Sequence, residues 1–482
     1  MTDYKDPSRL NAPAQDPIAG MGFGKEPKRD TVSVGSAEIS LESGQISERA
    51  LSWQRTAVLL FTEYIVLAIL AFPYSFQVLG MAGGVISTLI VGLFTLFTSH
   101  TLWQYCLLHP QIRDIADAAY WIFGEKRIWW YIGFTGLAFN NIFIMGLHCN
   151  AGATAINTLR PTICTSLWAF ILTIFMWAGS LIRDLRHTTI LGIVSAGTMF
   201  VCFLVVVIGH GVQGTPNGYV PATATTPATD LSWTVWAPEG TTFVQGVSAL
   251  LNIVYTFVGQ ALIPSFVGDM ARPEDFGKAL YLSMAAELLL FTITGAVVYS
   301  YTGTQLTTAP AYGSLIKRFG KPAAALTLPT IIIVGILYSL VTSRAIFFQI
   351  FPEHSVHRRT HTKKGWIVWV SIVTVIWIIA YIIGASVPFF SDLLSLISSL
   401  FDSWFGFIFW SFAFKSMYKR SGYFTSTWRT CQTVLHIISL VAGLFFFGAG
   451  TYAAAKSIQI SYSTGAVKTP FTCTNTGFLF TR

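Results

Sequence analysis

Residues 67–76 read LAILAFPYSF and residues 258–266 read VGQALIPSF, so Pro73 and Pro264 each interrupt a long apolar segment at a similar depth. Proline inside a helix removes a backbone hydrogen bond and clashes with the preceding turn, and unpaired backbone groups are costly in lipid. Such breaks are tolerated where they line a cavity, and a matched pair in two halves of one chain indicates a transporter binding site near the bilayer midplane. Proline kinks in ordinary membrane helices are the alternative explanation.

The composition defines the class of protein. Of 482 residues, 53% are hydrophobic and 11% are charged, against about 25% charged in a soluble protein. A membrane-spanning helix needs about 20 apolar residues. The sequence therefore predicts an all-α polytopic membrane protein with eleven transmembrane helices, near 54–78, 80–108, 129–158, 163–182, 188–210, 242–267, 279–303, 323–351, 366–385, 391–414 and 430–452.

The basic residues predict the orientation of the chain in the membrane. With residues 1–50 in the cytoplasm, the inward loops between the predicted spans carry fifteen Lys and Arg residues and the outward loops carry four. This is the positive-inside bias of membrane proteins. The net charge of +8 therefore orients the protein in the lipid bilayer and implies no nucleic-acid partner.

Three regions follow from this topology. Residues 1–50 carry eight acidic and six basic residues, four prolines and little apolar periodicity, which predicts a disordered cytoplasmic tail. Residues 51–453 form the membrane domain, and 454–482 form an extracellular tail. An odd number of spans places Cys164 and Cys473 on the same outer, oxidising face, where we expect a disulfide, with two free thiols as the alternative.

Ionisable residues inside the predicted spans are functional candidates because a charge near the bilayer centre costs about 2.5–3.5 kcal/mol. Glu63 is either a proton carrier or a buried acid that binds backbone freed by the helix break. His148 is either a proton carrier or a hydrogen-bonded core histidine. Asp402 lies deep in span 10, whereas Asp392 lies near the outer edge and is a candidate cap of that helix. Glu287 in span 7 is a further buried acid.

Polar stripes on several spans have two interpretations. Asn141 and His148 share one face of span 3, and Ser339 and Thr342 lie within a turn of each other on span 8, where their hydroxyls could bind a cation. Interhelical packing is the alternative, since such residues commonly bond between membrane helices. The sequence contains no metal-binding, dinucleotide, phosphate-binding or nucleophile motif. We therefore predict no cofactor, no metal and no enzymatic activity.

Five segments together resemble one family. They read EYIVLAILAFP at 63–73, NNIFIMGLH at 140–148, GQALIPSF at 259–266, PFFSDLLSLI at 388–397, and GTY at 450–452 followed by PFTC at 470–473. This set is similar to the amino acid/auxin permease family, and most similar to its fungal branch of neutral and aromatic amino-acid permeases. The resemblance covers about residues 47–473.

The resemblance implies a LeuT-like architecture with two inverted repeats of five spans, at about 54–210 and 242–414, and one further span at about 430–452. It also implies amino-acid uptake driven by a proton gradient. Members commonly carry glycine in the unwound part of span 1, where this chain has Val66, Leu67 and Ala68. Glycine lets a ligand approach the backbone, so we expect these side chains to narrow the site. Gly259 in span 6 is retained.

We therefore expect a secondary active importer of neutral, including aromatic, amino acids that works by proton symport and alternating access. The expected substrate site comprises Val66, Leu67, Ala68, Ile69, Ala71, Phe72, Asn141, Tyr255, Phe257 and Gly259, and the expected coupling residues are Glu63, His148, Ser339, Thr342 and Asp402. The plasma membrane is the expected location, with the vacuolar membrane as the alternative. An amino-acid sensor that binds without transport is the first rival function and a channel the second.

Overall fold

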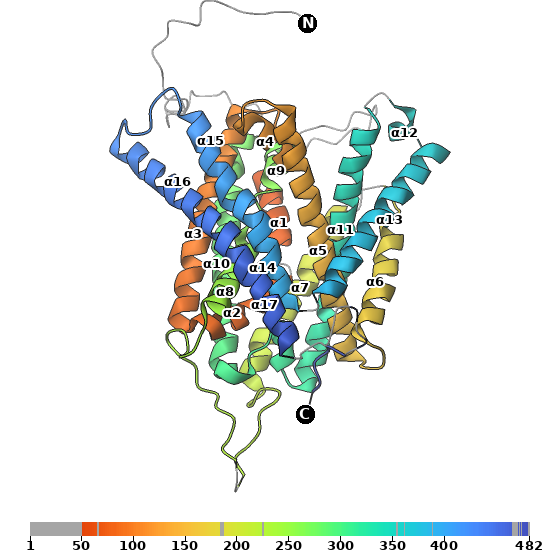
Figure 1. Cartoon of the computed structure of the whole chain (residues 1–482), viewed down its shortest axis with the longest axis vertical. Coiled ribbons are helices and arrows are strands. Elements are labelled where there is room, and N and C mark those ends of the chain that lie inside the picture. The colour runs from red at the N-terminus through yellow and green to blue at the C-terminus, as the bar shows by residue number, and fades with distance from the viewer. Residues whose placement is uncertain are drawn as a thin grey trace, which may run out of the picture.

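The structure is a computed structural model that describes residues 51–64, 67–183, 188–223, 226–352, 355–360, 362–387, 389–464, 471, 473 and 475–480. Regular structure in these ranges is helical, apart from an isolated bridge between Leu51 and Met270. The helices run between two ends of the molecule (Figure 1). We name these ends after the short helices found there, the α4 end (Ile115–Ile122) and the η4 end (Ala311–Ser314).

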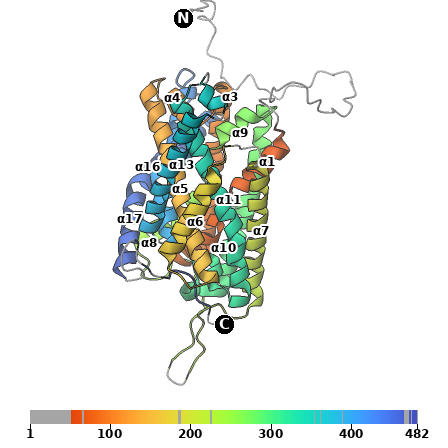
Figure 2. The ribbon, with the colours of Figure 1, turned by 90° about the vertical axis from the view of Figure 1, so that its right-hand side faces the viewer.

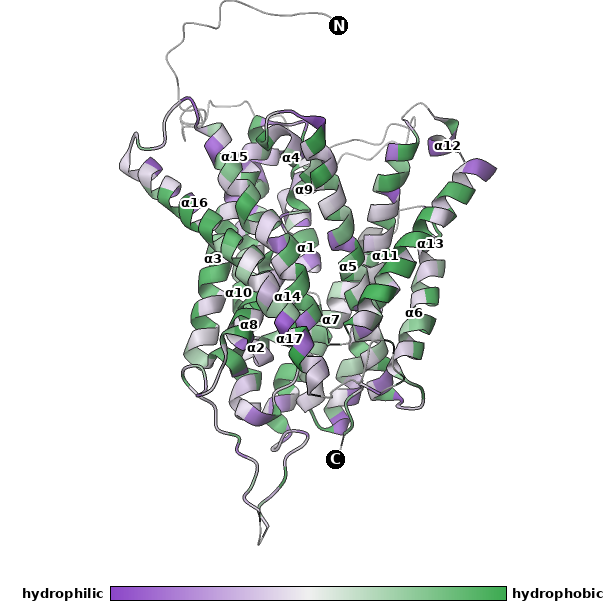
Figure 3. Cartoon of the chain, in the orientation of Figure 1, coloured by the Kyte–Doolittle hydropathy of each residue, from purple (hydrophilic) through white to green (hydrophobic). Residues whose placement is uncertain are grey.

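Eight helices in the described residues are long and apolar enough to cross a membrane. Apolar residues colour most of their length, and polar residues gather toward the two ends (Figure 3). The first six elements are α3 (Met81–Leu108), α5 (Arg127–Leu159), α7 (Thr188–Val212), α10 (Phe276–Leu306), α11 (Lys317–Ile350) and α13 (Lys363–Ser386). The seventh comprises α14 (Phe390–Ile397), the π-helical η5 (Ser398–Ile408) and α15 (Phe409–Met417), and the eighth comprises α16 (Thr427–Phe445), the π-helical η6 (Phe446–Gly450) and α17 (Thr451–Ser463). The chain is thus an all-α polytopic membrane protein.

Two predicted spans are discontinuous. Span 1 consists of α1 (Trp53–Tyr64), then η2 (Leu67–Ala71) and α2 (Phe72–Leu79), with a bend of 45°. Span 6 consists of α8 (Phe243–Phe257) and α9 (Ile263–Asp269), separated by residues 258–262. Pro73 and Pro264 lie in the first turn of α2 and α9, where a missing N–H costs nothing because that group has no intrahelical partner. Each proline therefore starts the second half of its span.

The count of eleven spans remains a prediction. The bent pair in span 1 makes a ninth candidate beside the eight long helices. Two shorter apolar helices, α6 (Thr165–Ser180) and α8, occupy the places predicted for spans 4 and 6. Seen from the side, α6 lies alongside α5 and α11 (Figure 2).

The last helix extends past the end predicted for span 11. Helix α17 continues to Ser463, whereas that span was predicted near 430–452. The boundary between membrane domain and tail at 453 and 454 stays a prediction. The sequence AAAKSIQISYS at 453–463 is not apolar enough to predict this extension. Two of its serines, Ser457 and Ser461, bind the Asp392 carboxylate of α14, which satisfies their hydroxyls inside the bundle.

The connections also contain short helices that the hydropathy pattern did not predict, namely α4, η3 (Pro273–Asp275), η4 and α12 (Val356–Arg359). Asp114 caps α4, because its carboxylate accepts a hydrogen bond from the Asp117 amide at 2.9 Å.

The ends of the two broken spans are joined by backbone hydrogen bonds. The Leu51 amide donates to the Asp269 carbonyl at 3.1 Å, and the Ala271 amide donates to the Leu51 carbonyl at 3.0 Å. Helices α1 and α9 therefore meet near the α4 end, whereas α2 packs against α8 nearer the η4 end (Figure 1).

Helix α5 is central to the bundle and packs against α4, α6, α11 and α13. Its contact with α13 depends on two glycines. A Cβ atom on Gly146 would lie 2.8 Å from the Ala380 carbonyl oxygen, and one on Gly384 would lie 2.4 Å from the Gly146 carbonyl oxygen. Small residues of this kind let membrane helices approach closely. This packing fixes α5, and with it Asn141 and His148, relative to α13.

Candidate functional site

The two breaks are lined by buried backbone and apolar side chains. Leu67, Ala68, Ile69 and Ala71 in η2 are at most 2% exposed. In span 6, turn hydrogen bonds join the Leu262 amide to the Gly259 carbonyl and the Ile263 amide to the Gln260 carbonyl, each at 3.2 Å. No side chain caps the first turn of α2. Val66 lies outside the described residues.

Three buried phenylalanines join the broken spans. Phe72 of α2 and Phe257 of α8 lie 6.3 Å apart between ring centroids, and Phe291 of α10 lies 4.9 Å from Phe72 and 5.1 Å from Phe257. Two of these residues were predicted to bound the substrate pocket, and the structure brings them together. Phe291 was missed, because its place in an unbroken apolar span gives no signal in the sequence.

Gly259 lies against Tyr64, the last residue of α1. A Cβ atom on Gly259 would come within 2.5 Å of Tyr64 Cε1, so glycine is required for this contact between the two breaks. The Tyr64 ring is buried, and its hydroxyl has no hydrogen-bond partner in the described chain. Tyr64 was not predicted as a site residue, although it adjoins Glu63.

Asn141 and Thr342 were predicted for different roles, and the structure joins them. The Asn141 side-chain amide of α5 donates to the Thr342 hydroxyl of α11 at 3.0 Å. On the same turns of α11, the Ser339 and Ser343 hydroxyls are fully buried and have no partner among the described residues. The four residues form a polar cluster between α5 and α11 with unused hydroxyl oxygens.

The two predicted carboxyl groups, Glu63 and Asp402, both interact electrostatically with Tyr338 of α11, and Asp402 also interacts with Tyr255. One Asp402 oxygen is buried with no hydrogen-bond partner in the described chain. Asp402 lies in η5, and π-helical turns of this kind are frequent at functional sites. Tyr338 was missed, although it directly precedes Ser339.

His148 of α5 lies against Gly335 of α11, one turn before Ser339. Its Nδ1 atom is 2.7 Å from the Ile144 carbonyl one turn earlier in α5, so this nitrogen donates and Nε2 carries the lone pair. The Nε2 atom is buried without a partner among the described residues. No hydrogen bond in that part of the chain joins His148 to Glu63, Thr342 or Asp402.

Asp392 does not cap its helix. The capping position of α14 is Phe389, and the Asp392 carboxylate accepts hydrogen bonds from Ser457 at 2.7 Å and Ser461 at 2.8 Å. This acid fixes α17 to α14 and has both oxygens satisfied.

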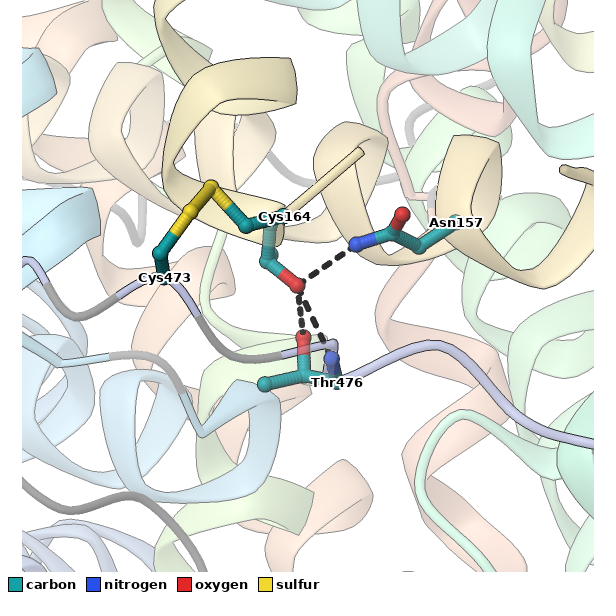
Figure 4. The surroundings of a disulfide bond; sticks show 5 residues. Asn157, Cys164, Cys473 and Thr476 are labelled. Carbon is teal, nitrogen blue, oxygen red and sulfur yellow. Dashed lines mark hydrogen bonds between the residues drawn. A yellow bond between two sulfur atoms is a disulfide. The ribbon is translucent and has the colours of Figure 1, made fainter. Parts of the chain in front are cut away.

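A disulfide joins Cys164 and Cys473, with an S–S distance of 2.19 Å (Figure 4). Close to it, the Thr476 amide donates to the Thr165 hydroxyl at 2.9 Å, and the Asn157 amide group lies 2.6 Å from the same hydroxyl. Farther along, the Phe478 amide donates to the Thr158 hydroxyl at 3.0 Å.

The C-terminal segment, meaning the described residues between 473 and 480, continues from the disulfide to η4 and α11. The Phe478 ring packs edge-on against Tyr312 of η4, and Phe480 lies against Gly320 of α11. The segment therefore connects α5 and α6 to η4 and α11 at the η4 end.

Comparisons with known proteins agree with this architecture. The family model described as transmembrane amino acid transporter protein matches residues 49–456. The chain is 30% identical over 442 residues to an N amino acid transport system protein of Neurospora crassa, which covers 90% of this chain and 91% of that one. It is 28% identical over 465 residues to a transmembrane transporter of Gibberella moniliformis, with 93% of each chain covered. An auxin transporter-like protein of Arabidopsis thaliana is 25% identical over 350 residues, which are 70% of this chain and 69% of that protein.

The fold and the paired breaks define a polytopic α-helical membrane protein with two discontinuous spans. The chain belongs to the transmembrane amino acid transporter family. It is therefore a multi-pass membrane protein of an amino-acid transporter family and not an enzyme.

Proposed function

We propose that this protein imports neutral amino acids by symport with protons, through alternating access at a site between the two broken spans. The observation that carries the proposal is the meeting of both breaks at Phe72 and Phe257, with Gly259 against Tyr64. Discontinuous helices of this kind bind substrates near the bilayer midplane in secondary transporters.

The substrate would bind along the backbone of both breaks. Its carboxylate would face the backbone amides of residues 68–71 and the positive N-terminal end of α2. Its ammonium group would face carbonyl oxygens near residues 255–259. Side chains at the breaks are apolar or aromatic, which supports a neutral substrate, and Asn141 and Tyr255 would supply the polar contacts at the rim.

The proton would bind to a carboxyl group inside the membrane domain. Glu63 at the end of α1 is the first candidate, because it adjoins the break and interacts electrostatically with Tyr338. Asp402 of η5 interacts with the same tyrosine, whereas His148 has no hydrogen bond to either acid in the described chain. The hydroxyls of Ser339 and Thr342 would stabilise the closed arrangement of α5 and α11 around the proton-binding groups.

The topology proposed for this cycle has eleven spans, with inverted repeats at about 54–210 and 242–414 and the N-terminus in the cytoplasm. The α4 end would then face the cytoplasm and the η4 end the outside, at the plasma membrane. The positive-inside distribution of Lys and Arg supports this orientation, as does the disulfide at the η4 end.

Radiolabelled uptake in a transport-deficient yeast tests the proposal. We expect saturable accumulation of neutral amino acids that collapses with a protonophore and survives the removal of sodium. Full accumulation after protonophore treatment would remove proton coupling. Saturable binding to the purified protein without any uptake into vesicles would identify an amino-acid sensor instead.

A further inference from the structure

Glu287 is a buried acid that the site described above does not use. It lies in α10, its residue is 0% exposed, and both carboxylate oxygens lack a hydrogen-bond partner in the described chain. Asp392, by contrast, is a buried acid with a serine hydroxyl on each oxygen. The contrast indicates that Glu287 is not held as a structural acceptor.

The helix face that carries Glu287 runs along α1 to the breaks. Residues at positions i, i+4 and i+8 share a helix face, and here they are Ser283, Glu287 and Phe291. The Ser283 hydroxyl donates to the Ala57 carbonyl of α1 at 3.3 Å. Phe291 packs against Phe72 and Phe257. Glu287 therefore lies between the contact with α1 and the point where both broken spans meet.

Tyr64 is the neighbour that interacts with this acid. Its hydroxyl is also without a hydrogen-bond partner among the described residues, and it interacts electrostatically with Glu287 and with Glu63. Tyr64 also contacts Gly259, so the two acids and the break of span 6 are adjacent to a single tyrosine.

No cation faces Glu287 in the part of the chain that the structure describes. Arg55 at the start of α1 is exposed, and Lys278 of α10 pairs with Asp275. The titratable groups on the elements packed against α10 are Arg55, Glu63 and Tyr64 on α1, Tyr74 on α2, His100, Tyr105 and Cys106 on α3, Cys202 and His210 on α7, Glu274 and Asp275 on η3, and Tyr312 on η4. The His100 side chain is hydrogen-bonded to the Tyr281 hydroxyl, and the His210 side chain to the Ser314 hydroxyl.

An isolated carboxylate in an apolar interior is far less stable than the neutral acid. The arrangement described here therefore requires a proton on Glu287. If α1 moved away from α10, water would reach the acid, and the O–H bond could break with transfer of the proton to that water. Contact between α1 and α10 would thus determine whether this residue is charged.

We propose that Glu287 is a second proton-binding residue of the transport cycle, on one path with Glu63 through Tyr64. The proposal rests on the proposed function. A proton from the outer side forms an O–H bond with the Glu287 carboxylate, and the same bond breaks when the proton leaves to cytoplasmic water. Substrate binding at the breaks, next to Phe291, would couple the movement of α1 to this exchange.

The test uses the purified full chain in vesicles. Glu287→Gln keeps the size of the side chain and removes the proton-binding oxygen. We expect it to retain exchange of labelled against unlabelled neutral amino acid at equal pH, and to lose both accumulation driven by a pH gradient and substrate-induced acidification of the vesicle interior. Asp392→Asn is the matched control at a buried acid with satisfied oxygens, and it should keep the ratio of accumulation to exchange of the wild type.

The outcomes separate the two proposals. If the wild type itself shows no accumulation driven by a pH gradient, the proposed symport is wrong. If the wild type accumulates substrate and Glu287→Gln does so equally, the assignment of Glu287 is wrong. If Glu287→Gln fails to fold, Glu287→Asp tests the assignment of Glu287 instead. We expect Glu287→Asp to keep coupling and to shift the pH midpoint of exchange. An unchanged midpoint would overturn the inference.

Discussion

The Asn141 side-chain amide donates a hydrogen bond of 3.0 Å to the Thr342 hydroxyl, and the two residues lie 201 positions apart in the sequence. The bond links α5 to α11, the helices expected to contribute a substrate contact and a coupling residue respectively. A change at either end of this bond should therefore affect transport as well as stability.

Thr342→Val removes the acceptor and leaves the Asn141 amide unpaired. We expect a loss of about 0.5–2 kcal/mol in the free energy of unfolding, together with reduced transport per folded molecule, and restoration of both by Thr342→Ser. Thr374→Val is the control, because the Thr374 hydroxyl accepts a hydrogen bond of the same length from Trp177, between α13 and α6. The two valine variants are compared by thermal unfolding and by uptake normalised to surface protein. Equal loss of normalised uptake in both would indicate that Thr342 has only a packing role.

Gly259→Ala tests the contact between the two breaks. The new Cβ atom would overlap the Tyr64 ring, so Tyr64 must move, at a cost of about 1–3 kcal/mol. We expect strongly reduced transport at nearly normal surface expression. Gly246→Ala in the same span places its Cβ atom where there is nothing within 4 Å, and it should transport normally. Normal kinetics in Gly259→Ala would show that the breaks do not form the substrate site.

Glu63→Gln tests the first candidate for proton binding. A carboxyl group that gains and loses a proton in each cycle cannot be replaced by an amide, whereas an amide can take over part of a structural hydrogen bond. Gradient-driven accumulation should therefore fall more than substrate exchange in reconstituted vesicles. A parallel decrease in both rates would favour a structural role for Glu63.

Because of the disulfide, we expect the loss of either cysteine to have the same effect on stability. Cys164→Ser, Cys473→Ser and the double variant should each lose about 2–4 kcal/mol of stability, with no further loss in the double variant. In non-reduced wild-type protein, mass spectrometry should find the linked peptides, while the exposed thiol of Cys431 is alkylated as an internal control. Alkylation of Cys164 and Cys473 without prior reduction would contradict the bond.

We expect the stability of the protein to depend on pH through Asp114 at the α4 end. Burial, reinforced by the neighbouring Asp117, raises the pKa of Asp114 to about 6, whereas an aspartate of an unfolded chain has a pKa of about 3.9. The folded state therefore favours the protonated acid, and this contribution to stability is present below pH 4 and lost as the pH rises to about 6. Asp114→Asn keeps a side chain that caps helices well and should flatten the melting temperature across this range. An unchanged pH profile would exclude Asp114 as its source.

The long helices could be predicted from the sequence because each needs a continuous apolar stretch. The prediction of 80–108 differs by one residue from α3, and the two proline breaks lie where the sequence indicated. The end of α17 could not be predicted, because its serines are satisfied by Asp392 on another helix. Hydropathy measures each residue alone and does not include such partners.

The candidate site could be predicted only in part, for a similar reason. Helical spacing indicates which residues share a face, as for Ser339 and Thr342, but not which helix lies opposite. The contacts of Tyr64 with Gly259, and of Phe291 with Phe72, join distant parts of the chain. Tyrosine and phenylalanine are common in membrane helices, so these two residues carried no signal of their own.

The backbone pairing of Leu51 with Asp269 and Ala271 has a mechanical consequence. It joins the residue that precedes α1 to the end of α9, so a movement of one of these half-helices would pull on the other. A movement of α1 alone would break both hydrogen bonds, whereas a movement of α1 together with α9 would keep them. We therefore expect α1 and α9 to move together when the breaks are exposed from the α4 end. Helices α2 and α8 would stay in place during this movement.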